Sequence, residues 1–578
     1  MEKRLTQREV ADVLEQIGLL LELKGENPFK SRAYINAARI ILNLEDDLEA
    51  LVNAEALSSI RGIGKALSSK ISTLMTTGTL PYFDDLKAGV PKDHLIMLRI
   101  QGLGPKKIIQ LHEALQINTL EELESACKSD RLLNVHGFGE KIQAKILRGI
   151  EQLRTREGLY LYAAANAELE SLLFNLQRNS GMATSLSAAG SLRRKCPVVR
   201  NIDLIAVSDQ AEQLSALFTA LPQSRSVLEK ENSNVNILLA SGMQAHLRIV
   251  RNEHFPFALR HFTGSKDHNA ALQRHCLRLG MTMNECGILK STDAPACRDE
   301  EEIYAALGLS FIPPELREDT GEIEAAENGR LPRLIEASDL RGIFHIHTSF
   351  SDGKDTIESI AATARQIGLE YIGISDHSRS AFYAKGLSEE SIKKQIEKID
   401  RINADHAGPY IFKGIEIEIL PNGRLDYDEN ILGLFDFVIA AIHSHFSMSE
   451  PEMTDRVCRA LDHPSVTMLA HPTGRLLLAR EPYAIDLEKV IERASALEKI
   501  IELNAHPDRL DLDWRWCKVA KKRNVKISIN PDAHTASGLS DIRCGIDQAR
   551  KGWLEASDCF NTLPLEEMKK FLRSKRRA

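Results

Sequence analysis

The alternation of short apolar strands with amphipathic helices in the last part of the chain restricts its fold more than any other feature. Segments such as "GIFHIH", "YIGIS" and "VKISIN" alternate there with helical segments such as "TIESIAATARQIG". Regular alternation over about 230 residues predicts a parallel sheet, either closed as a barrel of about seven or eight units or open and doubly wound. In a closed barrel the carboxyl ends of all strands meet at one rim.

Histidine and carboxylate side chains stand at or just after the ends of these predicted strands. His345 and His347 alternate on one strand, so both side chains point to the same side. The other candidates are Asp352, Asp376, His377, Glu416, His443, His471, Asp532 and His534. A single histidine of this kind is usually an ordinary core or surface residue, but a whole set at successive strand ends indicates a metal centre.

The donor atoms of this set limit the metals that it suits. Imidazole nitrogen and carboxylate oxygen without thiolate favour Zn²⁺, Mn²⁺ or iron over a structural cysteine-type zinc site. Two or three such ions can polarise a phosphate, lower the pKa of a bound water and stabilise a leaving oxygen. The pattern therefore predicts metal-dependent hydrolysis of a phosphoester.

The segments "HIHTSFSDG", "ISDHS", "GIEIEIL", "AAIHSH", "MLAHP" and "PDAH" resemble the motifs of the PHP (polymerase and histidinol phosphatase) family. That resemblance implies a distorted TIM-like α/β barrel that holds two or three Mn²⁺ or Zn²⁺ ions. Matched position by position, it gives the ligand role to His345, His347, Asp352, His377, Glu416, His443, His471, Asp532 and His534. His445 competes with His443 for its place, and Asp376 is an alternative orienting carboxylate rather than a ligand. Arg509, in "NAHPDRLDL", is either a catalytic phosphate contact or a salt bridge at the barrel rim.

The helical first part of the chain contains a repeated glycine motif. The segments "LSSIRGIGKALSSKI", "LRIQGLGPKKIIQL" and "LLNVHGFGEKIQAKI" share an apolar-x-G-x-G core that opens a helix. A tight G-x-G turn at a helix N-terminus leaves backbone N–H groups free to bind an anion, and a nearby lysine adds positive charge. The candidate DNA contacts are Gly62, Gly64, Lys65, Gly102, Gly104, Lys106, Gly137, Gly139 and Lys141.

These turns resemble helix-hairpin-helix motifs, and a site of this kind grips the phosphate backbone without reading bases. The segment "NPFKSRAYINAARII" also resembles the opening domain of X-family DNA polymerases, which engages the 5′-phosphate side of a gap. That resemblance makes Lys30 and Arg32 candidate phosphate contacts, although both are equally typical of a solvated helix face.

The middle of the chain alternates helices with short strands, as in an α+β domain. The segment "GSLRRKCPVVRNIDLIA" resembles part of an X-family polymerase palm, and "RHFTGSKDHNAALQRHCLRLGMTMNECGI" with "IPPELRE" resembles the thumb. The resemblance covers nearly the whole chain, in the order found in bacterial PolX proteins with a C-terminal PHP domain. It implies residual nucleotide contacts at Ser191 and Arg194 (triphosphate), Phe262 and Gly264 (sugar) and Asn269 (base edge).

The chain departs from the family where the polymerase chemistry would take place. The family pattern after the Gly-Ser turn ends Gly-Asp-x-Asp, whereas this chain has Asn201 before Asp203, and His246 replaces the third carboxylate. Two-metal phosphoryl transfer needs that negative charge, and a neutral nitrogen suits Mg²⁺ poorly. We therefore expect Asp203 to be a residual catalytic carboxylate, Mg²⁺ binding in the palm to be doubtful, and templated synthesis to be very weak or absent.

The sequence predicts a multidomain chain with an all-α start, a nucleotidyltransferase-like α+β middle and an α/β barrel. The expected parts are a helical DNA-binding region (1–155), the end of the fingers with the palm (156–257), the thumb (258–318), a linker (319–342) and the PHP domain (343–578). A net charge of −7 over 578 residues means that any basic DNA-binding surface is local.

Composition also bounds the cellular setting. The nine cysteines are scattered without a C-x-x-C pair, so neither a thiolate zinc site nor a disulfide framework is expected. The N-terminus has no apolar signal-peptide core, and no run of about 18 apolar residues occurs, which disfavours export and membrane insertion. A cytoplasmic monomer is the expectation.

The function that the sequence favours is a Mn²⁺-stimulated 3′-to-5′ exonuclease of DNA repair that acts on gaps and ends through the barrel. One alternative is an active gap-filling polymerase that binds gapped or primer-template DNA and dNTP. A second is a DNA-end-binding scaffold without catalysis, and a third is a phosphatase for a small phosphate monoester.

Overall fold

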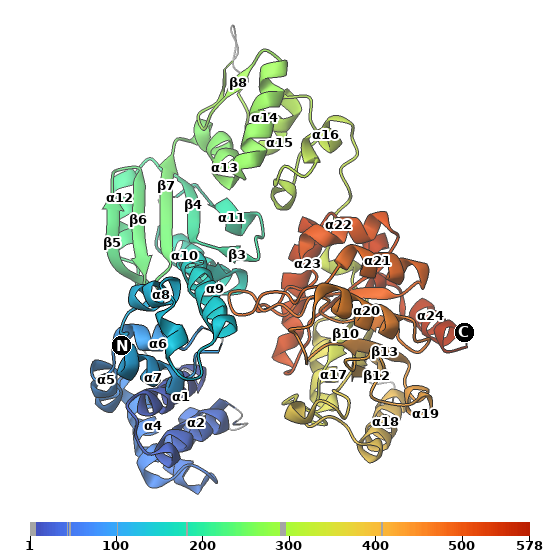
Figure 1. The fold of residues 1–578 in the computed structure, drawn as a ribbon. Helices are drawn as coiled ribbons and strands as arrows, with labels where there is room; N and C mark the ends of the chain where they lie inside the picture. Colours follow the sequence, from blue (N-terminus) through green and yellow to red (C-terminus); the bar gives the residue numbers. More distant parts are fainter. Residues whose placement is uncertain are drawn as a thin grey trace. The chain divides into compact units, whose positions relative to one another are not determined.

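The computed structural model describes residues 7–42, 44, 48–100, 102–180, 183–289, 296–405 and 408–577. The chain divides into two compact units, residues 1–157 and 158–578. Figure 1 draws the first unit in blue to cyan and the second in green to red. Among the described residues, no helix is long and apolar enough to cross a membrane, and none of the nine cysteines forms a disulfide.

The described part of the first unit is helical. Along α1, Val10, Leu14, Ile17 and Leu21 are buried at helical spacing and form one side of the unit's core. The helices are α1 (Gln7–Leu23), α2 (Pro28–Leu42), α3 (Leu48–Asn53), α4 (Lys65–Thr77), α5 (Pro81–Ala88), α6 (Lys92–Met97), α7 (Pro105–Leu115), α8 (Leu120–Lys128) and α9 (Glu140–Arg156).

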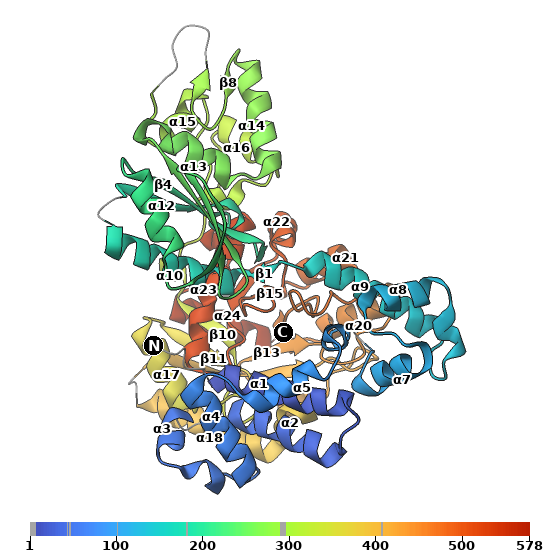
Figure 2. The same ribbon diagram turned by 90° about the vertical axis from the view of Figure 1, so that its left-hand side faces the viewer.

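The second unit begins with a palm-like α+β domain. Its five-stranded sheet has the order β2-β4-β7-β6-β5, in which only β4 and β7 are parallel neighbours. Figure 2 shows α10 and α12 on the same face of this sheet. The elements are β1 (Tyr160–Leu161), α10 (Tyr162–Ser180), β2 (Ser185–Ala189), α11 (Gly190–Arg193), β3 (Val198–Val199), β4 (Asn201–Val207), α12 (Ala211–Thr219), β5 (Ser224–Lys230), β6 (Asn234–Leu239) and β7 (Gln244–Val250).

A smaller helical domain, the thumb of the sequence prediction, follows the palm. It consists of α13 (Phe255–Thr263), α14 (Lys266–Arg278), the hairpin of β8 (Thr282–Met283) and β9 (Ile288–Leu289), and α15 (Glu300–Ala306). The segment 319–342, predicted as a linker, is well packed: it contains α16 (Glu322–Glu327), and Ile323 and Leu334 enter the core of the thumb. Ile335 enters the core of the barrel, so this segment joins the two domains through buried side chains.

The last domain is built on seven parallel strands in sequence order. Ile346 at the end of the first strand bridges Ala533 beyond the last strand, and the amide of His347 donates to the carbonyl of Ala533 (2.9 Å). The sheet therefore nearly closes, which selects the barrel over the open sheet. The strands are β10 (Gly342–Ile346), β11 (Tyr371–Ile374), β12 (Tyr410–Glu418), β13 (Phe437–Ala441), β14 (Met468–Leu469), β15 (Ile500–Asn504) and β16 (Ile527–Asn530).

Amphipathic helices cover the outside of the sheet (Figure 1); α17 to α22 join successive strands, and α23 and α24 follow the last strand. These helices are α17 (Ile357–Gln366), α18 (Glu389–Ala404), α19 (Glu429–Leu432), α20 (Glu450–Leu461), α21 (Leu487–Ala496), α22 (Trp514–Lys522), α23 (Ile542–Lys551) and α24 (Leu565–Arg577). Because each connection returns to the same end of the sheet, the loops after the strands gather at one rim.

Candidate metal centre

The nine candidate ligands of the barrel come together at the carboxyl ends of the strands. They form four overlapping groups in which one donor atom of each residue lies within 4.8 Å of the others. The groups are His347, Asp352, His377 and His534; His345, His471 and Asp532; His345, His347 and Glu416; and His377, Glu416 and His443. The arrangement joins residues that are almost 190 positions apart in sequence only because the barrel closes.

The carboxylate of Glu416, on β12, lies at the middle of the set. Its oxygens lie 2.8 Å from Nδ1 of His377, 3.0 Å from Nε2 of His471, and 3.3 Å from Nε2 of both His345 and His443. These four histidines come from four different strand ends. Glu416 belongs to two of the four groups and would help to hold a bound ion in either of them.

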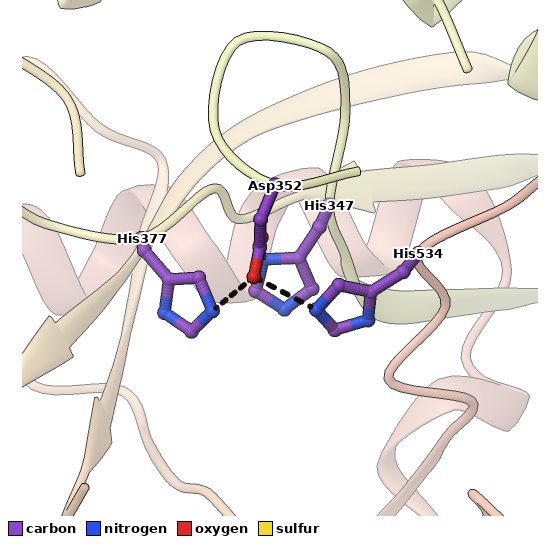
Figure 3. Close-up of side chains that lie close together, drawn as sticks. All are labelled: His347, Asp352, His377 and His534. Carbon is purple, nitrogen blue, oxygen red and sulfur yellow. Dashed lines mark ion pairs between the residues drawn. The ribbon is translucent and has the colours of Figure 1, made fainter. Parts of the chain in front are cut away.

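The loop after β10 brings a second carboxylate to the rim (Figure 3). Asp352 lies 3.6 Å from Nε2 of His377 and 3.5 Å from Nε2 of His534. The ring of His347 stacks between those two imidazoles, with centroid separations of 4.4 and 4.2 Å. One carboxylate and three imidazoles thus surround one small space, as a Mn²⁺ or Zn²⁺ site requires.

Three of the nine candidates have left-handed backbone conformations, which side chains other than glycine rarely adopt. The φ angles are 58° at His345, 24° at His471 and 52° at Asp532. Such conformations cost about 1–3 kcal/mol each and persist only where the surrounding structure holds them. These three backbone conformations occur at residues whose side chains meet in the candidate metal groups.

Further carboxylates hold the candidate ligands in place from behind. Glu502, buried on β15, lies 2.6 Å from Nδ1 of His345, and Glu418 lies 2.9 Å from Nδ1 of His443. Neither residue is predicted from the sequence, although Glu418 lies on β12 only two residues after Glu416 and Glu502 lies on β15. Such partners fix the ring orientation and the tautomer of a ligating histidine.

Asp376 and His445 do not belong to the candidate groups. Asp376 accepts hydrogen bonds from the amide of Thr348 (2.7 Å) and from Nε2 of Gln395 (2.5 Å), so it fastens the loop after β10. His445 is exposed, and His443 occupies the position beside Glu416. Arg509 lies at the rim with Nε 3.3 Å from Asp532, the salt bridge that the sequence analysis gave as one of its two roles.

The residues of the centre fit divalent ions because several of their buried polar atoms make no hydrogen bond, although imidazoles and carboxylates lie close together. Nε2 of His345, both ring nitrogens of His347, Nδ1 of His471 and Oε2 of Glu416 are buried without a hydrogen bond. Leaving such atoms unsatisfied is costly, and a cation would satisfy all of them. The donor set contains nitrogen and oxygen only, which suits Mn²⁺ and Zn²⁺.

Burial and the close approach of imidazoles and carboxylates also shift the pKa values of the centre. Burial alone would lower the pKa of His345, but three neighbouring carboxylates outweigh burial and raise it well above its usual range. Burial, together with two neighbouring imidazoles, lowers the pKa of His347 to about 3. His347 is therefore neutral at physiological pH, which is the form that binds a metal.

The three glycine turns of the first unit share one geometry. The first glycine of each turn, Gly62, Gly102 or Gly137, has a φ between 83° and 101°, and the second begins the following helix. Nothing lies within 4 Å of a side chain built at Gly64, Gly104 or Gly139. The helix starts are thus open, and the exposed Lys65, Lys106 and Lys141 stand one or two residues further on. Lys30 and Arg32 are also exposed, on α2.

Comparison with known proteins identifies the parts of the chain separately. A helix-hairpin-helix domain model matches residues 6–80, a SAM-like helix-hairpin-helix tandem matches 95–152, the DNA polymerase beta thumb matches 258–318, and the PHP domain matches 344–506.

Two relatives compare differently with the chain. The DNA polymerase/3′-5′ exonuclease PolX of Bacillus subtilis (strain 168) is 34% identical over 98% of this chain and 99% of its own length. The chain belongs to the PolX family. A protein of Thermoanaerobacter sp. (strain X514) named as a probable phosphatase is 29% identical over 40% of this chain and 94% of its own length.

The PolX palm of this chain has one carboxylate where the sequence predicts the residual site. Asp203 on β4 faces His246 on β7, with 3.2 Å between Oδ1 and Nδ1, and Nδ2 of Asn201 lies 3.4 Å from the same nitrogen. Gly190, with φ 64°, packs so closely that any side chain there would collide with the carboxylate of Asp203. His246 thus contacts both Asp203 and Asn201, and none of the three joins a candidate metal group among the described residues.

The predicted nucleotide contacts of the PolX palm and thumb have protein partners in this structure. Nε of Arg194 pairs with Glu318 (3.0 Å), and its Nη1 donates to the carbonyl of Thr263 (2.5 Å). Oδ1 of Asn269 accepts from Nη1 of Arg260 (3.0 Å), and its Nδ2 donates to the carbonyl of His261.

The other predicted contacts surround the same palm turn. The ring of Phe262 carries the guanidinium of Arg248 at 4.1 Å. Gly264 is buried against Arg194, and Ser191 is partly exposed on α11. A nucleotide would have to displace existing bonds to use Arg194 or Asn269.

Proposed function

We propose that this PolX protein is a DNA repair enzyme whose barrel removes nucleotides from DNA ends and gaps as a Mn²⁺-dependent 3′-to-5′ exonuclease. Support comes from the family, whose relative in Bacillus subtilis is named both a polymerase and a 3′-5′ exonuclease. The observation that carries the proposal is that nine candidate ligands lie together at one end of the barrel. Several of their buried nitrogen and oxygen atoms make no hydrogen bond.

In this proposal, the side chains that would hold two or three ions are His345, His347, Asp352, His377, Glu416, His443, His471, Asp532 and His534. When bound, divalent ions supply a more acidic water and stabilise the charge that develops on the phosphate. Glu502 and Glu418 keep the imidazoles of His345 and His443 in one orientation. Arg509, close to Asp532, offers its guanidinium to a phosphate oxygen of the substrate.

The helical unit would supply sequence-independent affinity for DNA. The open helix starts after Gly64, Gly104 and Gly139 present backbone N–H groups, and the exposed lysines beside them add positive charge. Such contacts bind phosphates without reading bases, and their strength falls as the salt concentration rises. We propose that the protein acts as a monomer on gapped or primer-template DNA.

We further propose that the palm contributes little nucleotide insertion. Asp203 is the one family carboxylate that it keeps, and His246 lies against it, which leaves little negative charge for Mg²⁺. A gap-filling polymerase is the second candidate function. The retained palm and thumb favour it, and so does the Bacillus subtilis relative, which is named a DNA polymerase.

One assay separates these functions. The purified protein and a His345→Ala/His347→Ala variant are placed on a gapped duplex with Mn²⁺, with and without dNTP, and the primer length is followed on a gel. Shortening of the primer by the wild type that disappears in the variant is expected. Extension that persists in the variant would assign the activity to the palm, and an uncut primer combined with hydrolysis of a small phosphate monoester would indicate a phosphatase.

A further inference from the structure

Two adjacent aromatic side chains stand out from the surface beside the barrel centre. Phe382 and Tyr383, in the loop between β11 and α18, are 88% and 68% exposed. Single exposed apolar residues are ordinary, but no other pair of adjacent aromatic residues among the described ranges is exposed. Exposure of two adjacent aromatic rings is therefore the feature of this loop that needs a physical explanation.

The loop holds the two rings outward by its own hydrogen bonds. Its ends meet where the amide of Leu387 donates to the carbonyl of His377 (2.9 Å), and the amide of Gly386 donates to the carbonyl of Ala381 (3.1 Å). A side chain at Gly386 would collide with the carbonyl oxygen of Ser378, so the turn closes too tightly for any other residue. Ala381, Ala384 and Leu387 are buried and anchor the loop. Burial of these anchors leaves Phe382 and Tyr383 on the outer side.

Tyr383, the second residue of the aromatic pair, lies beside the candidate metal centre. The ring of Tyr383 is 6.0 Å from the ring of His377 and 6.2 Å from the ring of His443, measured between centroids. The same loop also lines a cavity of about 280 Å³ on which Arg379 and Arg424 both border. Asp426 borders the same cavity, and none of the nine candidate ligands does.

We propose that Phe382 and Tyr383 form a stacking site for the nucleobase next to the phosphodiester that the barrel holds. Every nucleobase has an apolar face, so stacking on aromatic side chains binds all four bases and suits an enzyme that must act on any sequence. A sugar phosphate without a base would lose this contact. The inference rests on the proposed nuclease function for its substrate, but its geometry is independent of any polymerase activity.

The first test measures binding in the full-length protein loaded with Mn²⁺. Isothermal titration calorimetry compares dAMP with 2-deoxyribose 5-phosphate, which has the same phosphate and sugar but no base. We expect dAMP to bind the wild type about tenfold to a hundredfold more tightly, the range given by stacking of one base. In Phe382→Ala and in Phe382→Ala/Tyr383→Ala this ratio should fall toward one, and Phe382→Trp should retain it.

A matched control uses an exposed aromatic residue elsewhere. Phe174, on α10, is 60% exposed, and Phe174→Ala should leave the ratio unchanged. A ratio that stays the same in the double variant would overturn the stacking site, because any base discrimination would then come from another part of the chain. Loss of the ratio in Phe174→Ala as well would overturn it for the same reason.

A second test separates a base at a DNA end from a free nucleotide. Single-stranded oligonucleotides that end in a normal or an abasic 3′ nucleotide are compared for cleavage by the wild type and by Phe382→Ala. Faster cleavage of the normal end, lost in the variant, supports stacking of the DNA terminus. If no oligonucleotide is cut although dAMP binding still depends on Phe382, the nuclease proposal fails and the nucleobase site stands.

Discussion

The barrel centre and the palm site both lie where phosphate chemistry would need clustered carboxylates, but they differ in how their polar atoms are satisfied. In the barrel, Nε2 of His345, both ring nitrogens of His347 and Oε2 of Glu416 are buried and make no hydrogen bond. In the palm, Asp203, His246 and Asn201 are partly exposed, and His246 contacts both of the others. Buried polar atoms without hydrogen bonds are costly, so bound cations would stabilise the barrel centre more than the palm site.

The arginines of the two regions also differ in the protein partners that they already have. Arg509 stands at the barrel rim against Asp532, a residue whose charge a bound ion would share. Arg194 of the palm is fixed between Glu318 and the carbonyl of Thr263. An arginine with good existing partners must break them before it can bind a triphosphate. These contacts agree with the proposal that the barrel carries the nuclease activity and that the palm contributes little nucleotide insertion.

The largest expected effect is the loss of nuclease activity in Glu416→Gln. This substitution keeps the size of the side chain but removes the negative charge that four imidazoles share. We expect the rate of primer shortening in Mn²⁺ to fall by about a thousandfold or more, because electrostatic stabilisation is lost at the reacting phosphate. Gel assays under single-turnover conditions measure the rate.

Glu418→Gln is the matched control for that change. Glu418 lies two residues further along β12 and contacts His443 alone among the nine candidates. A partner behind a ligand typically contributes about tenfold to a hundredfold, so Glu418→Gln should lose much less activity than Glu416→Gln. Equal losses in the two variants would contradict the central position of Glu416.

The second effect is a gain of polymerase activity when the palm carboxylates are restored. In a His345→Ala/His347→Ala background, Asn201→Asp/His246→Asp should increase insertion of dNTP in Mg²⁺ by at least about tenfold, since two-metal transfer needs those charges. Primer extension on a one-nucleotide gap measures it. Adding Asp203→Asn should abolish the gain. Insertion that is already fast in the background protein, and not raised by the two aspartates, would contradict the view that this palm has lost its function.

The sequence predicts the barrel centre more completely than the palm because the two depend on different information. The nine candidate ligands stand at or just after strand ends. The nearly closed sheet of seven parallel strands then fixes where their side chains meet. No such rule predicts the partners of Arg194: Glu318, at the end of the thumb, pairs with it across 124 positions of sequence. Ion pairs between distant segments follow from packing, which periodicity and motifs do not specify.

The orienting carboxylates and the packed linker illustrate the same limit. Glu502 occurs in an apolar strand without a motif of its own, and its contact with His345 depends on the relative rotation of β10 and β15. Ile323 and Ile335 lie in a segment whose acidic composition is typical of a linker, yet each enters the core of a neighbouring domain. Local composition predicts turns correctly there but not burial.

The third effect is stabilisation of the protein by metal. Adding Mn²⁺ to the metal-free protein should raise the unfolding temperature by roughly 5–10 °C at a free ion concentration of about a hundred times Kd, equivalent to ~2.7 kcal/mol. Differential scanning fluorimetry measures the shift. The shift should disappear in His345→Ala/His347→Ala and remain in Asp203→Asn. A shift that depends on Asp203 instead would place the stabilising ion in the palm and would contradict preferential metal binding by the barrel.

The smallest expected effect concerns the ion pair that keeps Arg194 occupied. Lys551, on α23 of the barrel, is 1% exposed; its ammonium contacts Glu318 and donates to the carbonyl of Arg194 (3.0 Å). Lys551→Met should lower the free energy of unfolding at pH 7 by about 2 kcal/mol, because the buried carboxylate then keeps only Arg194 as a charged partner. Urea unfolding measures the change, and Lys394→Met, which removes an exposed pair with Glu390, should have no measurable effect.

The dependence of this loss on pH identifies its origin. Burial would raise the pKa of Glu318, but Lys551 and Arg194 outweigh burial and lower it. A carboxyl group with a depressed pKa stabilises the folded state above its unfolded pKa of about 4.3, and that contribution disappears as the pH falls through the folded value. The difference between the wild type and Lys551→Met should therefore be largest at neutral pH and shrink in acid. A difference that persists unchanged in acid would assign the loss to apolar packing of the lysine stem against Trp514, and the palm arginine would then be held by Glu318 without help from the barrel.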